Sequence, residues 1–203
     1  MSCCYIPTPY YKILKGLSFL KSVMDPGKSI FIDIGSGAGR VLFVAALEGF
    51  RYVLGIELSR SLCDLGDCNF NNYFRGDSDI DYRTIHSDLG DIEFNAFIED
   101  KYKGIESIVV YIGGTYAVGT DKLDELTKFK NIDIYILNIG PVGSKQPFED
   151  KGFSIIYEKI RNRSKPIQRH VKFSDAFQTT YDYPYGYRIY KRSRTEYVCE
   201  FRQ

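Results

Sequence analysis

The order of expected elements predicts an α/β fold, built as a doubly wound and mostly parallel sheet. Short β-branched runs alternate with segments of helical periodicity over the first two thirds of this 203-residue chain. Strands that are connected through helices in this way lie parallel, with right-handed crossovers. The last quarter breaks the alternation, because it is rich in tyrosine and offers only strand-like pieces.

Each element follows from its own local pattern. Helices are expected where apolar residues recur every three or four positions, at 10–24, 41–48, 60–74 and 122–129, with a weaker pattern at 92–98. Strands are expected for the apolar runs at 30–34, 52–56, 81–86, 107–112, 132–137 and 153–160, and for the pieces at 187–190 and 197–201. Asp25-Pro26-Gly27 supplies a turn before the first strand, and Ser59 is expected to cap the helix that follows it.

The segment Asp33-Ile34-Gly35-Ser36-Gly37-Ala38-Gly39-Arg40 joins the first strand to the next helix. Glycine at every second position lets the backbone turn sharply and approach a ligand closely. The helix that begins there offers free N–H groups and the positive end of its dipole. Glu57 closes the following strand, where a carboxylate can hold the two hydroxyls of a ribose. These features predict a site for a nucleoside-containing cofactor at one edge of the sheet.

The spacing of the glycines distinguishes between two such cofactors. A dinucleotide fingerprint, G-x-G-x-x-G/A, requires a third small residue at position 40, where this chain has Arg40. An acid two residues before G-x-G-x-G resembles motif I of the class I S-adenosylmethionine (SAM) methyltransferases. The resemblance favours SAM over a nicotinamide dinucleotide, and over a glycine-rich turn that binds no ligand.

The resemblance extends over roughly residues 5–140. Pro7-Thr8-Pro9-Tyr10, motif I and Gly55-Ile56-Glu57-Leu58-Ser59 resemble a group of small, largely uncharacterised class I methyltransferases. Motif I and Val109-Val110-Tyr111 are also similar to the disruptor-of-telomeric-silencing histone-lysine methyltransferases. The resemblance implies a Rossmann-like, doubly wound, seven-stranded sheet, mostly parallel with an antiparallel C-terminal hairpin. We expect a single domain over 1–203, with an N-terminal helical cap (1–28), a cofactor-binding core (29–140) and a β-rich, basic C-terminal part (141–203).

The same resemblance implies which residues contact the cofactor. The glycine loop would pass beside its methionine part, and Glu57 would hold the ribose. Asp88 would accept a hydrogen bond from the adenine amine, unless it only caps the segment that follows it. The expected cofactor-binding set is Asp33, Gly35, Ser36, Gly37, Gly39, Glu57, Leu58, Asp88, Leu89 and Gly113.

The fourth strand ends at Tyr111-Ile112-Gly113-Gly114-Thr115-Tyr116, where the superfamily places the methyl group. Many members have Asn-Pro-Phe or Asn-Pro-Pro-Tyr there. This chain has neither, which removes the usual basis for methylation of the adenine amine. The candidate catalytic residues are Tyr111, Thr115 and Tyr116, because tyrosines near a sulfonium offer cation–π stabilisation and a threonine is polar. A turn that has lost its catalytic role is the alternative.

Three further residues are weaker candidates. Thr8 and Tyr10 are expected to close over the cofactor from the N-terminal helix. Asn138, after the fifth strand, is expected to face the same edge, with loop capping as the alternative.

Charge is distributed unevenly along the chain, although the net charge is only +1. Residues 159–194 carry ten Lys or Arg against two Asp, and they also include five tyrosines between 181 and 190. Positive charge with aromatic stacking suits single-stranded nucleic acid or an acidic peptide. An ordinary solvated hairpin remains the favoured interpretation, so nucleic acid is the alternative partner.

The remaining composition indicates an intracellular protein. The five cysteines are an odd number, and none has metal-ligand spacing with either histidine, so we expect free thiols and no metal. The start of the sequence has no secretory pattern, and no run reaches the ~18 apolar residues of a membrane span. A cytoplasmic location is expected, with the nucleus as an alternative.

These observations together predict SAM-dependent methyl transfer. A protein side chain or a small molecule is favoured as the acceptor, and RNA is an alternative. Two rival functions remain: a non-catalytic module that binds SAM or S-adenosylhomocysteine (SAH), and a nicotinamide-dependent oxidoreductase.

Overall fold

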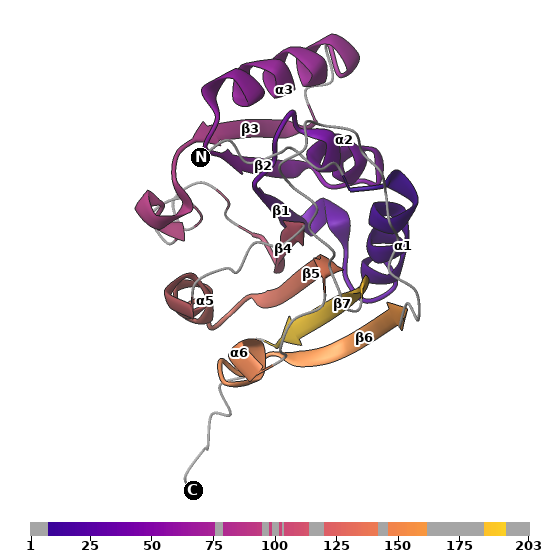
Figure 1. Cartoon of the computed structure of the whole chain (residues 1–203), viewed down its shortest axis with the longest axis vertical. Helices are drawn as coiled ribbons and strands as arrows, with labels where there is room; N and C mark the ends of the chain where they lie inside the picture. The colour runs from indigo at the N-terminus through magenta and orange to yellow at the C-terminus, as the bar shows by residue number, and fades with distance from the viewer. Residues whose placement is uncertain are drawn as a thin grey trace, which may run out of the picture.

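A computed structural model of the chain describes residues 8–75, 79–94, 98, 102, 104–113, 120–141, 146–161 and 185–193 (Figure 1). Its strands are β1 (Ser29–Ile34), β2 (Tyr52–Glu57), β3 (Asp81–His86), β4 (Ser107–Gly113), β5 (Asp133–Pro141), β6 (Ser154–Arg161) and β7 (Tyr185–Arg192). Its α-helices are α1 (Tyr10–Leu20), α2 (Arg40–Leu47), α3 (Arg60–Tyr73), α5 (Thr120–Thr127) and α6 (Gln146–Glu149). Two short 3₁₀ helices, η1 (Pro26–Lys28) and η2 (Leu89–Asp91), lie in the connections.

The strands form one seven-stranded sheet in the order β3-β2-β1-β4-β5-β7-β6. The first five strands in this order are parallel, and β7 pairs antiparallel with both β5 and β6. The predicted fold class, including the antiparallel hairpin, is therefore confirmed. The strand order reverses between β1 and β4, and ligands of open α/β sheets bind at the carboxyl ends of the strands at such a point.

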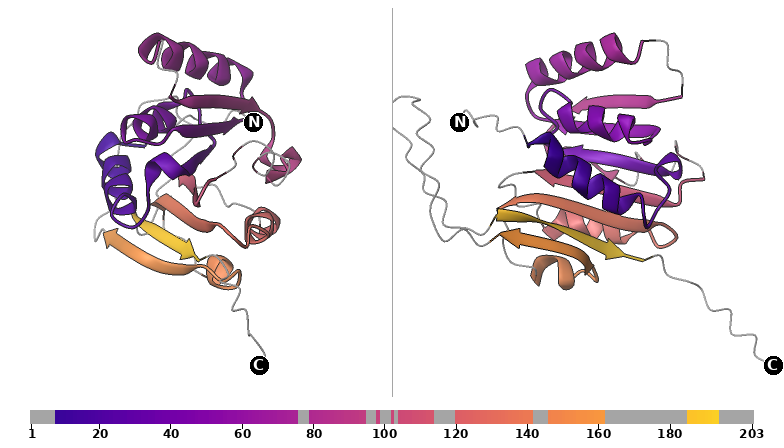
Figure 2. Two further views of the ribbon diagram at one scale, coloured as in Figure 1. Left: turned by 180° about the vertical axis from the view of Figure 1, so that it is seen from behind. Right: turned by 90° about the vertical axis from the view of Figure 1, so that its right-hand side faces the viewer.

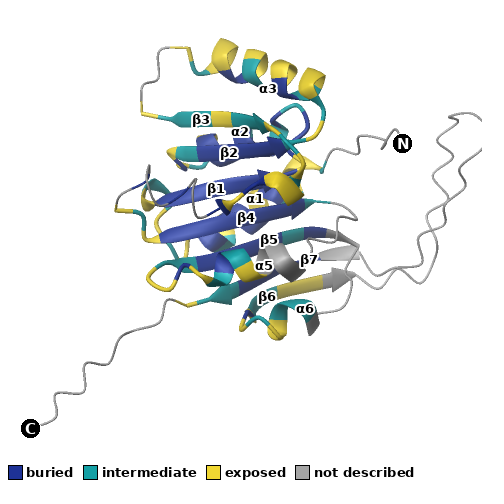
Figure 3. Ribbon diagram, turned by 90° about the vertical axis from the view of Figure 1, so that its left-hand side faces the viewer, coloured by how far each residue is buried: buried dark blue, intermediate teal, exposed yellow. Residues whose placement is uncertain are grey.

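Helices cover both faces of the sheet. Helices α1, α2 and α3 lie on one face, and α5 and α6 lie on the other (Figures 1 and 2). Alternate residues of each central strand therefore enter two separate cores, so that Phe31 packs in the first and Ile32 in the second. All six residues of β1 are buried, and β4 is buried except at its last residue (Figure 3). This burial explains why both strands have nearly uninterrupted apolar sequences.

Several boundaries differ from the sequence predictions. Helix α1 ends at Leu20 rather than at residue 24, and Val23 is 44% exposed instead of lying on the buried face. The Asp25-Pro26 pair that follows favours a turn here, because proline disfavours helical geometry in the residue before it. Strand β5 continues beyond residue 137 to Pro141, because β7 pairs with it along Ile134–Pro141.

Ser59 was expected to cap α3, and it does so by position but not through its side chain. It occupies the N-cap position, but its hydroxyl makes no capping bond and lies 3.1 Å from the hydroxyl of Ser61. The Ser59 N–H is held instead by Glu57, whose carboxylate reaches it at 2.8 Å. Most of the helix expected at 92–98 and all of the strand expected at 197–201 lie outside the described residues.

Within the described part of the chain, no helix is long and apolar enough to cross a membrane.

Candidate cofactor site

The glycine loop between β1 and α2 has a backbone that only glycine adopts easily. Gly35, Gly37 and Gly39 have φ values of 75°, 55° and 75°. A side chain at any of these positions would be strained in the left-handed region. The N–H groups of Gly35 and Ser36 donate to the carbonyl of Ile56 at 2.8 and 3.1 Å. The end of β2 thus anchors the loop at the point where the strand order reverses.

Glu57, at the end of β2, ties this loop to the next one. Its Oε2 accepts a hydrogen bond from the N–H of Gly37, and its Oε1 accepts one from the N–H of Ser59, both at 2.8 Å. A carboxylate oxygen has two lone pairs, so each oxygen can still accept from a ligand hydroxyl. The side chain predicted to hold a ribose is therefore oriented before any ligand arrives.

Asp33 lies inside the sheet just below the loop, with Gly55 and Tyr111 as its register partners on the two neighbouring strands. It is 1% exposed, and neither carboxylate oxygen has a hydrogen-bond partner among the described residues. Burial, with a smaller contribution from the charge of Glu57, raises its pKa to about 8. The hydroxyl of Ser36 is also buried and has no hydrogen-bond partner within the described part of the chain. Unpartnered buried polar groups are costly, and a donor ligand in the loop would relieve that cost.

The residues expected around adenine lie at the ends of β2 and β3. Leu58 is 67% exposed, and its carbonyl lies 3.0 Å from Nε2 of His86. Asp88 caps η2, because its Oδ1 accepts the N–H of Gly90 at 2.8 Å. The capping alternative is thus realised, while a contact of Asp88 or Leu89 with adenine stays a prediction.

At the end of β4, the buried Tyr111 ring turns its hydroxyl toward Thr8, 2.6 Å from its Oγ1. A Cβ at Gly113 would lie 2.8 Å from that same hydroxyl, so only glycine leaves room for the Tyr111 phenol. Thr115 and Tyr116 lie outside the described residues. Tyr10 stacks against the guanidinium of Arg40. Asn138 is half-buried in β5, beside Ile112 of β4.

Sequence reasoning missed the residues that support the loop from behind. A Cβ at Gly55 would lie 2.6 Å from Oγ of Ser36, and one at Gly66 would lie 3.2 Å from the carbonyl carbon of Ala38. Helix α3 therefore packs its backbone directly on the loop at Gly66. A glycine inside an amphipathic helix is the sequence signal that could have indicated this close approach.

The basic C-terminal segment is partly neutralised where the structure describes it. Arg188 is 7% exposed and pairs with Glu158, and Nζ of Lys191 lies 2.9 Å from Asp133. Residues 162–184 of this segment lie outside the described part. No group of three or more His, Cys, Asp or Glu that could hold a metal ion occurs among the described residues.

No family model matches the chain, and no curated protein matches it in sequence. Solved structures share its fold. Magnesium protoporphyrin IX methyltransferase from Synechocystis PCC 6803, with bound SAM, has a TM-score of 0.54 at 13% identity, over 90% of this chain and 79% of that one. The chain has the fold of SAM-dependent methyltransferases.

Two further structures with this fold are named as candidate enzymes that act on RNA. The Streptococcus pneumoniae protein, a candidate tRNA (m1A22) methyltransferase, has a TM-score of 0.58 at 14% identity, over 95% of this chain and 74% of that one. A candidate RNA methyltransferase from Pyrococcus horikoshii has a TM-score of 0.58 at 15% identity, over 93% and 86%. At such low identity, these similarities establish the fold alone.

Proposed function

We propose that this protein binds SAM and transfers its methyl group to an acceptor. The observation that carries the proposal is the buried Asp33 carboxyl, which lacks a partner in the described structure directly below a glycine loop. An ammonium group, such as that of the methionine part of SAM, would supply the missing donor. Glu57, fixed by two backbone N–H groups, would hold the ribose hydroxyls. When bound, SAM supplies an electrophilic methyl group on a sulfonium.

The end of β4 supports a role in positioning the acceptor. Methyl transfer requires a nucleophile in line with the sulfonium inside a site that excludes water. Tyr111 has its hydroxyl held by Thr8, and Gly113 carries no side chain that would displace the Tyr111 ring. We assign Tyr111 the role of packing against the reacting methyl group, together with Thr115 and Tyr116 as predicted from sequence.

The fold does not identify the methyl acceptor, because proteins with one fold act on many different substrates. A protein side chain or a small molecule remains our favoured acceptor. The cytoplasm remains the expected location. A non-catalytic SAM-binding module is the second candidate, and the absence of the Asn-Pro motif after β4 favours it. This candidate would bind the cofactor equally well and would leave the methyl group in place.

Isothermal titration calorimetry with SAH and with NAD tests which cofactor the protein binds. We expect SAH to bind and NAD not to bind, and the reverse result would overturn the proposal. Replacing Glu57→Ala should weaken SAH binding by roughly 1–3 kcal/mol, since the ribose would lose its acceptor. Gly37→Val should abolish binding, because its backbone has φ 55° and a branched side chain would fill the cofactor's space. Asp64→Ala, an exposed acid on α3, is the matched control and should bind normally.

Incubation with methyl-labelled SAM and candidate acceptors then separates the two functions. Transfer of label to a protein or to a small molecule would support the enzyme. Tight SAH binding with no transfer to a broad cellular extract would favour the non-catalytic module.

A further inference from the structure

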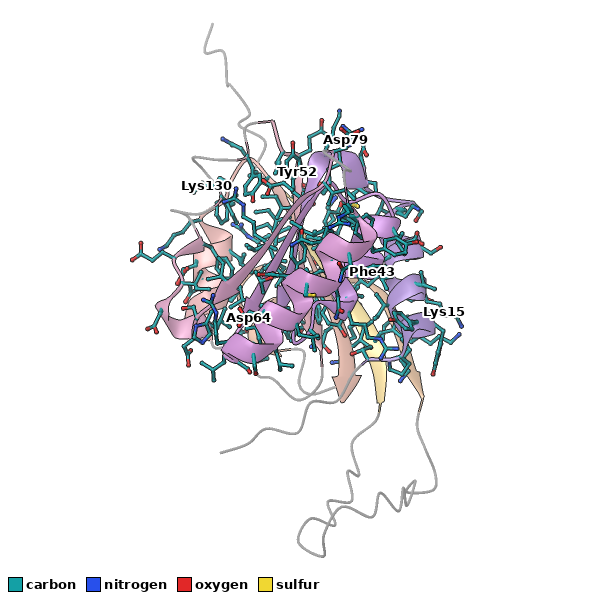
Figure 4. All side chains as sticks on the ribbon, turned by 90° about the horizontal axis from the view of Figure 1, so that it is seen from above. Lys15, Phe43, Tyr52, Asp64, Asp79 and Lys130 are labelled. Carbon is teal, nitrogen blue, oxygen red and sulfur yellow. The ribbon has the colours of Figure 1, made fainter. Side chains whose placement is uncertain are left out.

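A cavity lies beside the glycine loop, on the face that α1, α2 and α3 cover. It has a volume of about 320 Å³. Its lining residues are Tyr10, Ala38, Gly39, Arg40, Phe43, Gly66, Asn69 and Phe70. Of these residues, Gly39 belongs to the expected cofactor-binding set and Tyr10 was expected to close over the cofactor. Figure 4 shows Phe43 beside helix α3. This size is at the lower end of pockets that bind small molecules.

Arg40 gives the cavity a positive charge that no acid among the described residues neutralises. Its guanidinium carbon lies 3.8 Å from the centre of the Tyr10 ring. Its Nε is buried without a hydrogen-bond partner, and no carboxylate in the described residues pairs with it. An unpaired guanidinium with a dry N–H group is a strong site for a phosphate, because charge-assisted hydrogen bonds to such an anion are short and strong.

The walls and floor of the cavity suit a flat ring. Tyr10, Phe43 and Phe70 contribute aromatic rings, and Tyr10 is 48% exposed. The floor is backbone, because Gly39 and Gly66 have no side chains and the helix and loop touch there. Asn69 adds an exposed amide that can both donate and accept. None of the lining residues is acidic, so the lining combines stacking surface with one cation.

We propose that this cavity binds a nucleotide, with the base against the aromatic residues and the phosphate at Arg40. The nucleotide is either free or part of a strand, and stacking on aromatic side chains tolerates any base. A phosphorylated peptide would also satisfy Arg40, but it would leave the aromatic walls without a flat partner. The proposal does not rest on the methyl transfer proposed above, because Arg40, Asn69 and the rings of Phe43 and Phe70 are not among the residues expected to hold the cofactor.

Calorimetry with uridine monophosphate tests the proposal on the full chain, with SAH present in excess so that the cofactor site is occupied. We expect uridine monophosphate to bind, and uridine without its phosphate to bind about tenfold more weakly or not at all. A decauridylate strand distinguishes the two sources, because tighter binding of the strand indicates nucleic acid and equal binding indicates a free nucleotide. Binding of a phosphotyrosine peptide in place of uridine monophosphate would overturn the proposal.

Three variants locate the binding. Arg40→Gln should weaken uridine monophosphate binding about tenfold or more, and Asn69→Asp should weaken it by placing a negative charge at the exposed rim. Lys15→Gln, a change of an exposed cation on α1, should have no effect; Figure 4 shows Lys15 apart from Phe43. Binding that survives both Arg40→Gln and Asn69→Asp would overturn the assignment. Loss of nucleotide binding with SAH binding intact shows that the two sites act separately, and absent SAH binding would count against the cofactor proposal alone.

Discussion

The carboxyl group of Asp33 is buried on the face of the sheet that α1 and α2 cover. Its neighbours on the adjacent strands, Gly55 and Tyr111, donate no hydrogen bond to it. Burial of such a group disfavours its charged form, and this is the main reason that its pKa lies near 8. The residue therefore lowers the stability of the free protein at the pH where it would serve a ligand. A loss of stability of this kind is typical of functional sites, because buried ionisable groups with shifted pKa values are kept there for their role and not for stability.

The pH dependence of stability should reveal this cost. Folding raises the pKa of Asp33 from 3.8 to about 8, so the folded protein holds a proton that the unfolded chain releases between these values. The contribution of Asp33 to the free energy of unfolding is therefore full below about pH 4 and is lost as the pH rises through 8. Asp33→Asn should remove this loss, so the variant should match wild type at low pH and exceed its stability at pH 8. Urea denaturation of both proteins at pH 4 and pH 8 measures the difference; a constant difference would contradict the assignment.

Sequence reasoning predicted the positions of these residues but not their contacts. The order of strand, glycine loop and acid places Asp33 and Glu57 at the same edge of the sheet, because the carboxyl ends of parallel strands lie together. The bond from the Gly37 N–H to Glu57 depends on the path of the loop in space, and so does the missing partner of Asp33. Neither feature can be predicted from residue spacing or hydrophobic periodicity.

Helix α3 shows how one element holds another in place. Its Gly66 touches the loop at Ala38, and the hydroxyl of Tyr82 on β3 closes the same space from the other side. Tyr82 is fixed in turn by the Thr84 hydroxyl, which donates to it at 2.9 Å, and by its ring stacking on Phe70. The glycine loop is thus supported by two elements that follow it in sequence.

Gly66→Ala should therefore destabilise the protein, although alanine is the better helix former by about 1 kcal/mol. The new Cβ would lie 3.1 Å from the Tyr82 hydroxyl and 3.2 Å from the carbonyl carbon of Ala38, which is tighter than ordinary contact. SAH binding should weaken with it, because α3 would displace the loop. Asn71→Ala, at an exposed position of the same helix, is the control and should not lower stability. Thermal unfolding and calorimetry measure both effects, and a stabilised Gly66→Ala protein would refute the close contact.

Thr8, two residues before α1, is held to the sheet by the hydrogen bond between its hydroxyl and that of Tyr111. Thr8→Val keeps the shape of the side chain but removes its hydroxyl, so the free energy of unfolding should fall by about 0.5–1.5 kcal/mol. Thr8→Ser keeps the hydroxyl and should lose less. Urea denaturation compares the three proteins, and equal losses for valine and serine would show that the bond to Tyr111 contributes nothing.

Element boundaries were predictable to within a few residues where local sequence decides them. β3 was predicted at 81–86 and is observed there, because its ends coincide with turn-forming residues. β5 and β7 are longer than predicted, since each is extended by pairing with a strand distant in sequence. The end of α1 was misplaced because Val23 continues the apolar period while its backbone has already left the helix.

At the scale of the whole molecule, the antiparallel hairpin of β6 and β7 adds strands with charged side chains to one end of a parallel sheet whose central strands are apolar. The basic character of the last quarter suggested a face for an anionic partner. Where the structure describes this region, two of its cations are instead paired within the sheet, Arg188 with Glu158 and Lys191 with Asp133. The sequence shows how many charges there are, but which of them face inward depends on pairing between strands.

This arrangement predicts different effects for two cations on neighbouring strands. Arg188→Ala would leave Glu158 beside a buried space without its partner, and breaking buried ion pairs costs about 3–5 kcal/mol. Glu158 keeps 30% of its side chain exposed, so we expect a loss toward the lower end of that range. Lys159→Ala, at an exposed position of β6, should change stability by about 0.5 kcal/mol or less. Replacing both Arg188 and Glu158 with alanine should cost less than the sum of the single changes, because the pair is removed together. Urea denaturation of the four variants tests this coupling, and additive losses would show that Arg188 acts through packing and not through its charge.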